Sequence, residues 1–177
     1  MLVVLVLLPV LEKAFRRCKR AVGKSLRMDE TYIRIRDEWR YLYRAVDKAG
    51  NTVDFLLRAR RDKAAARAYF EKAIDQNGEP QTVTIDRSGS NLACLASDQR
   101  QAGSAEQGPP EKVSEQHCRQ DHRAIKRQTR PMMGFRNFRC ARIILGGIET
   151  MHMIRKSQMN DSGKALSPAR QFYSLFA

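Results

Sequence analysis

The sequence lacks the cysteine spacing of a structural metal site. The chain has four cysteines: Cys18, Cys94, Cys118 and Cys140. None stands in a Cys-x-x-Cys pair, the ligand spacing typical of structural zinc. His117 and His122 lie near Cys118, but this segment has no fourth ligand and its spacing matches no known zinc module. The pattern therefore predicts reduced, unpaired thiols in a cytosolic protein.

The sequence also has no apolar run long enough to span a bilayer. Residues 1–10 are nearly all Leu and Val, but a transmembrane helix needs about 20 apolar residues. No basic residue precedes the run and no small-residue cleavage site follows it, which argues against a signal peptide. We therefore expect residues 1–8 to be a start site inside a truncated gene, with an interfacial helix or membrane association as the alternative. The expected protein is cytoplasmic, bacterial and without a membrane partner.

Acidic side chains are scarce beside basic ones. The chain carries 33 Lys and Arg against 19 Asp and Glu, a formal net charge of +14 on 177 residues. Residues 11–27 supply +6 and residues 119–156 supply +8, so the rest of the chain sums to zero. Two basic blocks on a neutral body are typical of a protein that binds a polyanion, usually a nucleic-acid phosphate backbone, at two surfaces. The alternative is a pair of solvated helix faces.

A carboxylate interrupts the alternating pattern at residues 28–35. Thr31, Ile33 and Ile35 share one parity, as in a half-buried strand, and Asp29 falls on that same parity. A buried carboxylate is costly unless it is paired or bound to a cation. The pattern therefore gives the hypothesis that Asp29 is a metal ligand on the first strand of a sheet. The alternative is a frayed strand end or a turn residue.

The following segments predict a meander, a helix and a fourth strand. Strands are expected at 39–46 and 52–57, after tight turns at 36–37 and 48–51. Asp62 is the expected N-cap of a helix that ends at Asn77–Gly78, and a fourth strand follows at 81–85. The apolar face of this helix is expected to comprise Ala66, Tyr69, Phe70, Ala73 and Ile74. A short basic helix is expected at 12–20, before the sheet. The order β-β-β-α-β predicts an α/β fold. The hydrophobic content of 42% is enough to fill the core of one such domain.

Several motifs together resemble one known family. They are Met-Asp-Glu-Thr-Tyr at 28–32, Trp-Arg-Tyr-Leu-Tyr-Arg-Ala-Val-Asp at 39–47, Asn-Thr-Val-Asp-Phe at 51–55, Thr-Ile-Asp at 84–86, Gln-Asp-His-Arg-Ala-Ile-Lys-Arg at 120–127 and Gly-Phe at 134–135 through Gly-Gly-Ile-Glu at 146–149. The chain resembles an insertion-sequence DDE transposase, most of all the bacterial insertion-sequence six group, over most of residues 9–158. The resemblance implies a ribonuclease H-like mixed sheet flanked by helices, in a catalytic domain at residues 27–156. Residues 1–26 would be a remnant linker, with the family's helix-turn-helix part expected upstream of the chain.

The resemblance also implies a metal site and a reaction. Two Mg²⁺ or Mn²⁺ ions held by three carboxylates would cut and join DNA. Asp29 and Asp86 match the first two carboxylates and are expected within about 8 Å of each other on adjacent strands, because two-metal sites hold their ions a few ångströms apart. Arg119 stands where the family has its third carboxylate. Glu115 and Asp121 are the only nearby acidic substitutes, and Asp121 would lie on the wrong helical face.

The middle of the domain departs from the family. Residues 95–118 are polar and have no apolar period, which predicts a loop or disorder instead of the family's helix and strand. The simplest account is a segment read out of frame between two compensating shifts. Without the family pattern, Asp86 could equally be a turn or helix N-cap residue.

Two later segments are predicted to be helices. The expected helix at 119–130 carries a basic stripe suited to phosphates: Arg119, Arg123, Lys126, Arg127 and Arg130. A last helix at about 136–154 is expected to point Phe138, Ala141, Leu145, Ile148 and His152 inward, with His152 as a packing residue. Residues 157–177 are expected to be a flexible tail.

Three functional hypotheses follow from the resemblance. The first is an enzyme that cleaves and transfers strands at element ends and target DNA, acting as a homo-oligomer. The second is a non-catalytic DNA-binding relic, and the third is a product that does not fold stably. Arg119 and the polar interval favour the last two, so we expect a transposase by descent that is inactive as this chain stands.

Overall fold

The computed structural model describes residues 2–85, 123, 125–132, 134–160 and 166–176. Asp86, Arg119, the acidic substitutes near it and the polar interval at 95–118 lie outside these residues. The chain divides into two compact units, one comprising residues 22–134 and the other comprising residues 1–21 with 135–177. Each unit is described by itself.

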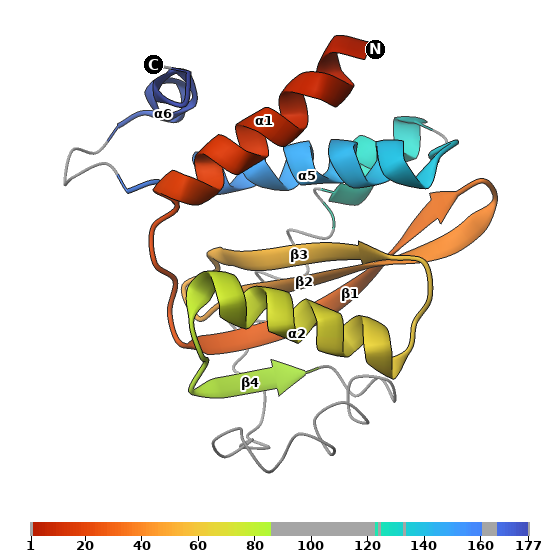
Figure 1. The fold of residues 1–177 in the computed structure, drawn as a ribbon, viewed down its shortest axis with the longest axis horizontal. Helices are drawn as coiled ribbons and strands as arrows, with labels where there is room; N and C mark the ends of the chain where they lie inside the picture. The colour runs from red at the N-terminus through yellow and green to blue at the C-terminus, as the bar shows by residue number, and fades with distance from the viewer. Residues whose placement is uncertain (1, 86–122, 124, 133, 161–165, 177) are drawn as a thin grey trace. The chain divides into compact units, whose positions relative to one another are not determined.

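The unit at 22–134 is built on a mixed four-stranded sheet (Figure 1). Its elements are β1 Ser25–Ile35, β2 Glu38–Asp47, β3 Thr52–Arg58, α2 Lys63–Asn77, β4 Thr82–Ile85 and the short 3₁₀ helix η1 Arg130–Met132. The strand order is β3-β2-β1-β4, in which the first three strands form an antiparallel meander and β4 is parallel to β1. The predicted β-β-β-α-β order and the α/β class are therefore confirmed.

The hairpin between β1 and β2 has a two-residue turn. Arg36 and Asp37 both adopt positive φ, 49° and 63°, which matches the right-handed twist of the flanking strands. The turn sets the register that pairs Ile35 with Glu38 and continues to Leu26 opposite Asp47. Asp47 then holds the next turn, because its carboxylate accepts hydrogen bonds from the Asn51 N–H at 2.8 Å and the Gly23 N–H at 3.0 Å.

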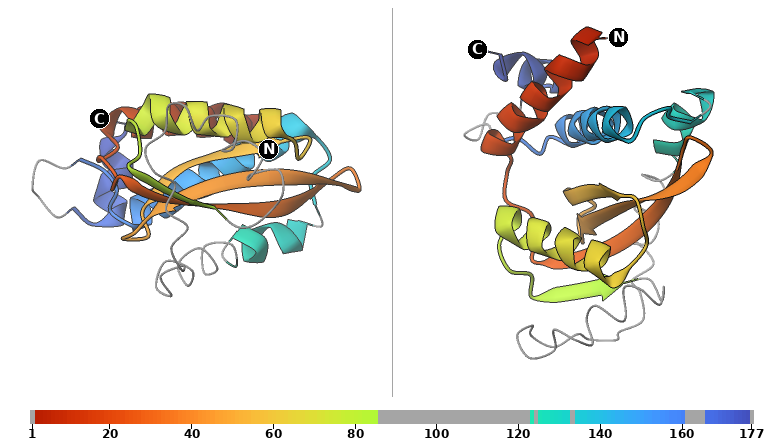
Figure 2. Two further views of the ribbon diagram at one scale, coloured as in Figure 1. Left: turned by 90° about the horizontal axis from the view of Figure 1, so that it is seen from below. Right: turned by 45° about the vertical axis from the view of Figure 1, so that its right-hand side comes forward.

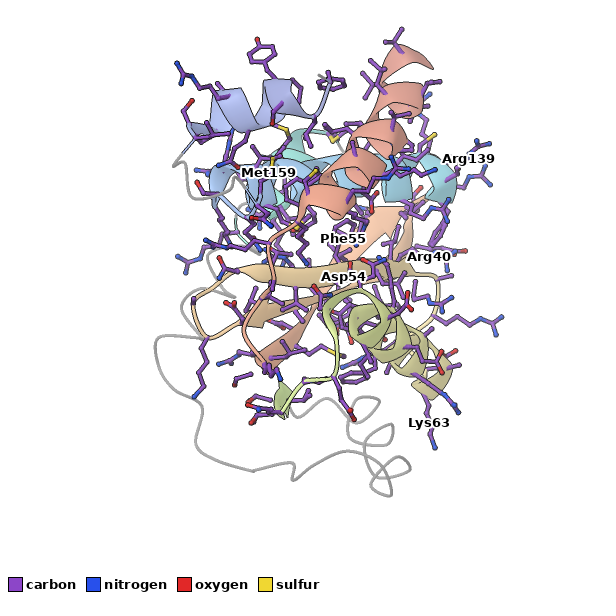
Figure 3. The ribbon with its side chains drawn as sticks, turned by 60° about the vertical axis from the view of Figure 1, so that its left-hand side comes forward. Arg40, Asp54, Phe55, Lys63, Arg139 and Met159 are labelled. Carbon is purple, nitrogen blue, oxygen red and sulfur yellow. The ribbon has the colours of Figure 1, made fainter. Side chains whose placement is uncertain are left out.

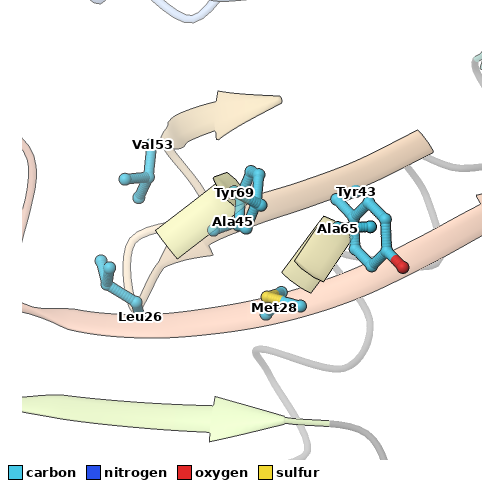
Figure 4. Close-up of a cluster of buried hydrophobic side chains, with 7 residues drawn as sticks. All are labelled: Leu26, Met28, Tyr43, Ala45, Val53, Ala65 and Tyr69. Atoms are coloured by element: carbon cyan, nitrogen blue, oxygen red, sulfur yellow. The ribbon is translucent and has the colours of Figure 1, made fainter. Parts of the chain in front are cut away.

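One face of the sheet is covered by α2 (Figure 2). Asp62 caps the helix as predicted, its carboxylate accepting from the Ala65 N–H at 2.7 Å, and Gly78 ends it with a φ of 79°. The buried cluster between helix and sheet is shown in Figure 4 and comprises Leu26, Met28, Tyr43, Ala45, Val53, Ala65 and Tyr69. The prediction that Ile74 belongs to this face is wrong, since its side chain is exposed.

A buried charge pair connects α2 to β3. Asp54, labelled with Phe55 in Figure 3, is buried, and its Oδ1 accepts from the Lys72 Nζ at 3.1 Å. The same ammonium donates to the Phe55 carbonyl at 2.7 Å and lies 5.0 Å from the Phe55 ring centroid. Tyr69 donates its hydroxyl to the Asp54 carbonyl at 3.0 Å. These contacts hold α2 in a fixed position against β3.

The second unit is helical. It contains α1 Leu2–Cys18, α5 Phe138–Arg155 and α6 Pro168–Ser174. The prediction for residues 1–20 is corrected, because the helix begins at Leu2 and runs through Pro9 instead of beginning near residue 12. Leu8 of α1 packs over Gly147 of α5, where a Cβ would lie 2.6 Å from a Leu8 methyl. No helix in the described part of the chain is both apolar enough and long enough to cross a membrane.

The inward face of α5 is wider than predicted. Ala141, Leu145 and His152 are buried as expected, whereas Phe138 and Ile148 are only half-buried. Met153 and Ile154 in the last turn also belong to the core, and two polar side chains before that turn are buried: Glu149 and Thr150.

The expected flexible tail contains ordered contacts. The Asn160 N–H donates to the Cys18 carbonyl at 2.7 Å, and Lys19 forms a β-bridge with Met159. Helix α6 follows with Ser167 as its N-cap. A cap and a first-turn proline favour this short helix, and the flexibility of residues 157–177 stays a prediction. The two described cysteines, Cys18 and Cys140, are free thiols as predicted.

Candidate functional site

Asp29 lies on β1, the strand that pairs with both β2 and β4. Its side chain is half-buried, and its Oδ1 accepts a hydrogen bond from the Glu30 N–H at 2.7 Å. Thr31, Ile33 and Ile35 are buried on the same parity, as the alternation predicted. The residue is inside the strand, which excludes the frayed end and the turn that were the alternatives to a ligand.

The parallel ladder between β1 and β4 ends immediately before the two predicted ligands. Its register pairs Ser25 with Thr82 and ends with Met28 opposite Ile85. Asp29 is the next residue on β1, and Asp86 is the next residue in sequence after β4. Asp86 itself lies outside the described residues, so its distance to Asp29 stays a prediction.

A buried guanidinium faces Asp29 across the β1–β2 ladder. Arg44 is the Cα partner of Asp29, and directly opposed residues place their side chains on the same face of a sheet. Arg44 is 2% exposed and donates to the Thr52 Oγ1 at 2.8 Å. Sequence reasoning missed this residue because a basic residue inside a strand pattern is usually a solvated one. Its position brings a fixed positive charge to the face that carries Asp29.

The opposite face of β1 carries a second carboxylate. The Glu30 side chain is largely buried, and the Arg61 Nε lies 3.1 Å from its Oε1. Tyr43 is the cross-strand partner of Glu30 and is fully buried. Burial, aided by the negative charge of Glu30, raises the pKa of Tyr43 to about 12. Glu30 shares the parity of Leu26 and Met28, and that signal could have identified it as a buried residue.

The described residues do not make up a complete metal centre. No group of three His, Cys, Asp or Glu side chains that could hold a metal ion occurs within them. Asp29 supplies one carboxylate, and its cross-strand partner Arg44 is a cation. A divalent ion in a two-metal site needs several oxygen ligands from different elements. The donor set found here is therefore insufficient by itself.

The basic stripe predicted after residue 119 is exposed where the structure describes it. Residues 123 and 125–129 are helical, and Ile125 is fully buried, which fixes the inward side of the segment. The four exposed basic side chains are Arg123, Lys126, Arg127 and Arg130. Arg119 lies outside the described residues. The exposed charge is suited to binding phosphates.

The element order and the parallel β1–β4 pair define a ribonuclease H-like domain. Residues 23–158 match the family described as the DDE domain. The chain is 34% identical over 154 residues to the transposase for insertion sequence-like element IS431mec and to that for IS257 in transposon Tn4003, both of Staphylococcus aureus. The chain belongs to the DDE-domain family of insertion-sequence transposases. The match covers 84% of this chain and 65% of each relative.

Solved structures show the same fold. The HTLV-2 integrase catalytic core domain in complex with magnesium has a TM-score of 0.50 and 14% identity, over 86% of this chain and 98% of that one. The catalytic core domain of BIV integrase has a TM-score of 0.52 and 13% identity, over 86% and 95% of the two chains. The predicted ribonuclease H-like fold is confirmed.

Proposed function

We propose that residues 27–156 form the catalytic domain of an insertion-sequence DDE transposase whose metal site is incomplete, so that it binds DNA without cutting or joining it. The observation that carries this proposal is the parallel register that pairs Met28 with Ile85. Neighbouring strands lie about 4.8 Å apart, so a ladder continued by one residue would bring the carboxylates of Asp29 and Asp86 to one site. These two residues would then hold a magnesium ion.

The third ligand position opposes metal binding. Arg119 stands where the family has a glutamate, directly before the Gln-Asp-His run at 120–122. A guanidinium there removes an oxygen donor and repels the cation. Arg44 adds a second fixed positive charge on the Asp29 face. Two-metal chemistry depends on ligands placed to a fraction of an ångström, so two carboxylates flanked by these cations do not suffice.

The remaining function is DNA binding. The exposed basic residues at 123–130 would bind phosphates of element ends or target DNA without reading the sequence. In intact relatives we expect this domain to act in a homo-oligomer on DNA. The alternative, an active transposase, requires Glu115, Asp121 or another carboxylate to replace the missing glutamate.

A strand-joining assay tests the absence of activity. The purified chain is incubated with a pre-nicked element end, a target duplex and either Mg²⁺ or Mn²⁺. We expect no joined product above the level of the Asp29→Asn variant, and we expect Arg119→Glu alone not to restore it. Joined product that depends on Asp29 would show that another carboxylate completes the site.

A metal titration tests the two-carboxylate pair separately. Mn²⁺ binding is measured by electron paramagnetic resonance for the parent chain, for Asp29→Asn and for Asp75→Asn. Asp75 is exposed on α2 and serves as the matched control. We expect weak binding that is lost in Asp29→Asn and kept in Asp75→Asn. Equal binding by all three would contradict a site at Asp29.

A further inference from the structure

The hairpin of β1 and β2 presents aromatic rings to solvent on one face. Tyr32 is 44% exposed and Trp39 is 60% exposed. Tyr32 pairs with Tyr41 and Arg34 pairs with Trp39 across the two strands, so these four side chains lie on one face. The Tyr32 and Tyr41 rings meet edge to face with centroids 5.5 Å apart. We call these four residues, with Arg58, the hairpin platform.

The two faces of the hairpin differ in their exposure to solvent. On the opposite parity of the same hairpin, Thr31, Ile33 and Ile35 are all buried. Tyr41 packs against the apolar cluster under α2, which anchors the inner end of the platform, while Tyr32 and Trp39 lie farther out. Large exposed aromatic rings gathered on one face mark binding surfaces more often than isolated exposed apolar residues do.

The charge around the rings is positive. Arg58 of β3 is the cross-strand partner of Tyr41, and its Nε is buried without a hydrogen-bond partner in the described part of the chain. Arg34, opposite Trp39, has a side chain that is 57% exposed. Asp37 offsets part of this charge, because it accepts from Arg34 at 2.7 Å. Four further basic residues follow in the turn and after β3, all exposed: Arg36, Arg60, Arg61 and Lys63. Glu30, on the same parity of β1 as Tyr32, offsets the charge of Arg61, whose Nε lies 3.1 Å from the Glu30 Oε1.

We propose that the hairpin platform binds single-stranded DNA, with bases stacked on Trp39 and Tyr32 and phosphates held by Arg34 and Arg58. Aromatic rings beside a basic groove are the combination that single-strand binding uses, because every unpaired base offers a flat face for stacking. In a duplex those faces are already stacked on neighbouring bases. The surrounding arginines favour a polyanion over an apolar protein partner. The choice of DNA over other single strands rests on the proposed function.

Tryptophan fluorescence reports directly on binding at the hairpin platform, because Trp39 is the only tryptophan in the chain. The full chain is titrated with oligothymidylate of about 12 nucleotides, within the usual site size, and with a duplex of the same length. Both titrations contain EDTA, so that metal chemistry plays no part. We expect the single strand to quench Trp39 and the duplex to bind without comparable quenching. Binding of the single strand without any change in Trp39 emission would overturn the proposal.

Substitutions then measure what the ring contributes. Because the ring under a stacked base contributes to binding, Trp39→Ala should weaken single-strand binding about tenfold (about 1.4 kcal/mol), measured by anisotropy of a labelled oligonucleotide. Trp39→Phe should retain most of the affinity. Tyr173→Ala is the matched control, since Tyr173 is 71% exposed on α6, and it should change affinity less than about twofold. An equal effect of Trp39→Ala and Tyr173→Ala would overturn the proposal.

The duplex arm separates this inference from the proposed function. Duplex binding that depends on Arg123 and Arg127, with no single-strand effect of Trp39→Ala, would leave the proposed function intact and overturn the platform. Single-strand binding that depends on Trp39, without duplex binding, would support the hairpin platform and contradict the proposed duplex binding by the exposed basic residues. If Trp39→Ala alters the oligomeric state in sedimentation and leaves single-strand affinity unchanged, the face is a protein interface and the proposal is wrong.

Discussion

Removing the Lys72 ammonium, which pairs with Asp54 between α2 and β3, should destabilise the protein more than removing a charge from an exposed ion pair. Lys72→Met keeps the aliphatic stem of the side chain but removes the charge that lies 3.1 Å from Asp54 Oδ1 and the donor to the Phe55 carbonyl at 2.7 Å. Breaking a fully buried pair costs about 3–5 kcal/mol. The Asp54 side chain is 0% exposed but that of Lys72 is 28% exposed, so water already solvates part of the ammonium. We therefore expect a loss of about 2–3 kcal/mol.

Urea unfolding and thermal unfolding, both followed by circular dichroism, measure this loss. Arg67→Met is the matched control on the same helix, because Arg67 pairs with Glu71 at 2.9 Å and both side chains are 64% exposed. An exposed pair contributes about 0–1 kcal/mol. The melting temperature should fall by roughly 4–12 °C for Lys72→Met and by far less for Arg67→Met. If the two variants lose equal stability, the pair at Asp54 does not contribute as a buried one, and the reasoning is refuted.

Three further predictions concern a tyrosine, two glycines and the exposed basic helix. The pKa of Tyr43 is about 12 in the folded chain and about 10 in the unfolded chain. The neutral phenol therefore contributes fully to the free energy of unfolding below pH 10, and this contribution is lost as the pH rises towards 12. Tyr43→Phe should therefore reduce the loss of stability above pH 10, measured by urea unfolding, whereas Tyr173→Phe should not. Gly134→Ala should cost about 2 kcal/mol or more and Gly78→Ala about 1 kcal/mol in thermal unfolding. Both glycines have positive φ, but only at Gly134 would the Cβ meet a backbone oxygen, that of Arg34 at 3.1 Å; equal destabilisation by the two variants would contradict this account. Four exposed basic residues are then replaced by glutamine: Arg123, Lys126, Arg127 and Arg130. The magnitude of the salt slope of duplex binding should fall by roughly 3.6, at about 0.9 for each phosphate that is no longer neutralised, and an unchanged slope would exclude these residues as phosphate-binding.

Local patterns predicted most of the sheet and its helix. The alternation at 31–35, the turn at Arg36–Asp37 and the cap at Asp62 involve residues close in sequence, and the structure places each as expected. The first part of α1, before residue 12, was missed because an all-apolar run has no period that separates helix from strand. The exposure of Ile74 on α2 was also misjudged, since sequence periodicity does not show how much of the apolar side of a helix the sheet covers.

The sequence by itself determined the family, the order of strands and helix, and the position of Asp29 on a strand parity shared with buried isoleucines. It also predicts that Arg119 stands where the family has its third carboxylate. The tertiary structure alone decided that β4 is parallel to β1 with Met28 opposite Ile85, and that Arg44 faces Asp29. Pairing between distant segments depends on burial of both faces of β1 and not on any local preference. For the same reason, only the register could show that Tyr32, Arg34, Trp39 and Tyr41 share one face of the hairpin.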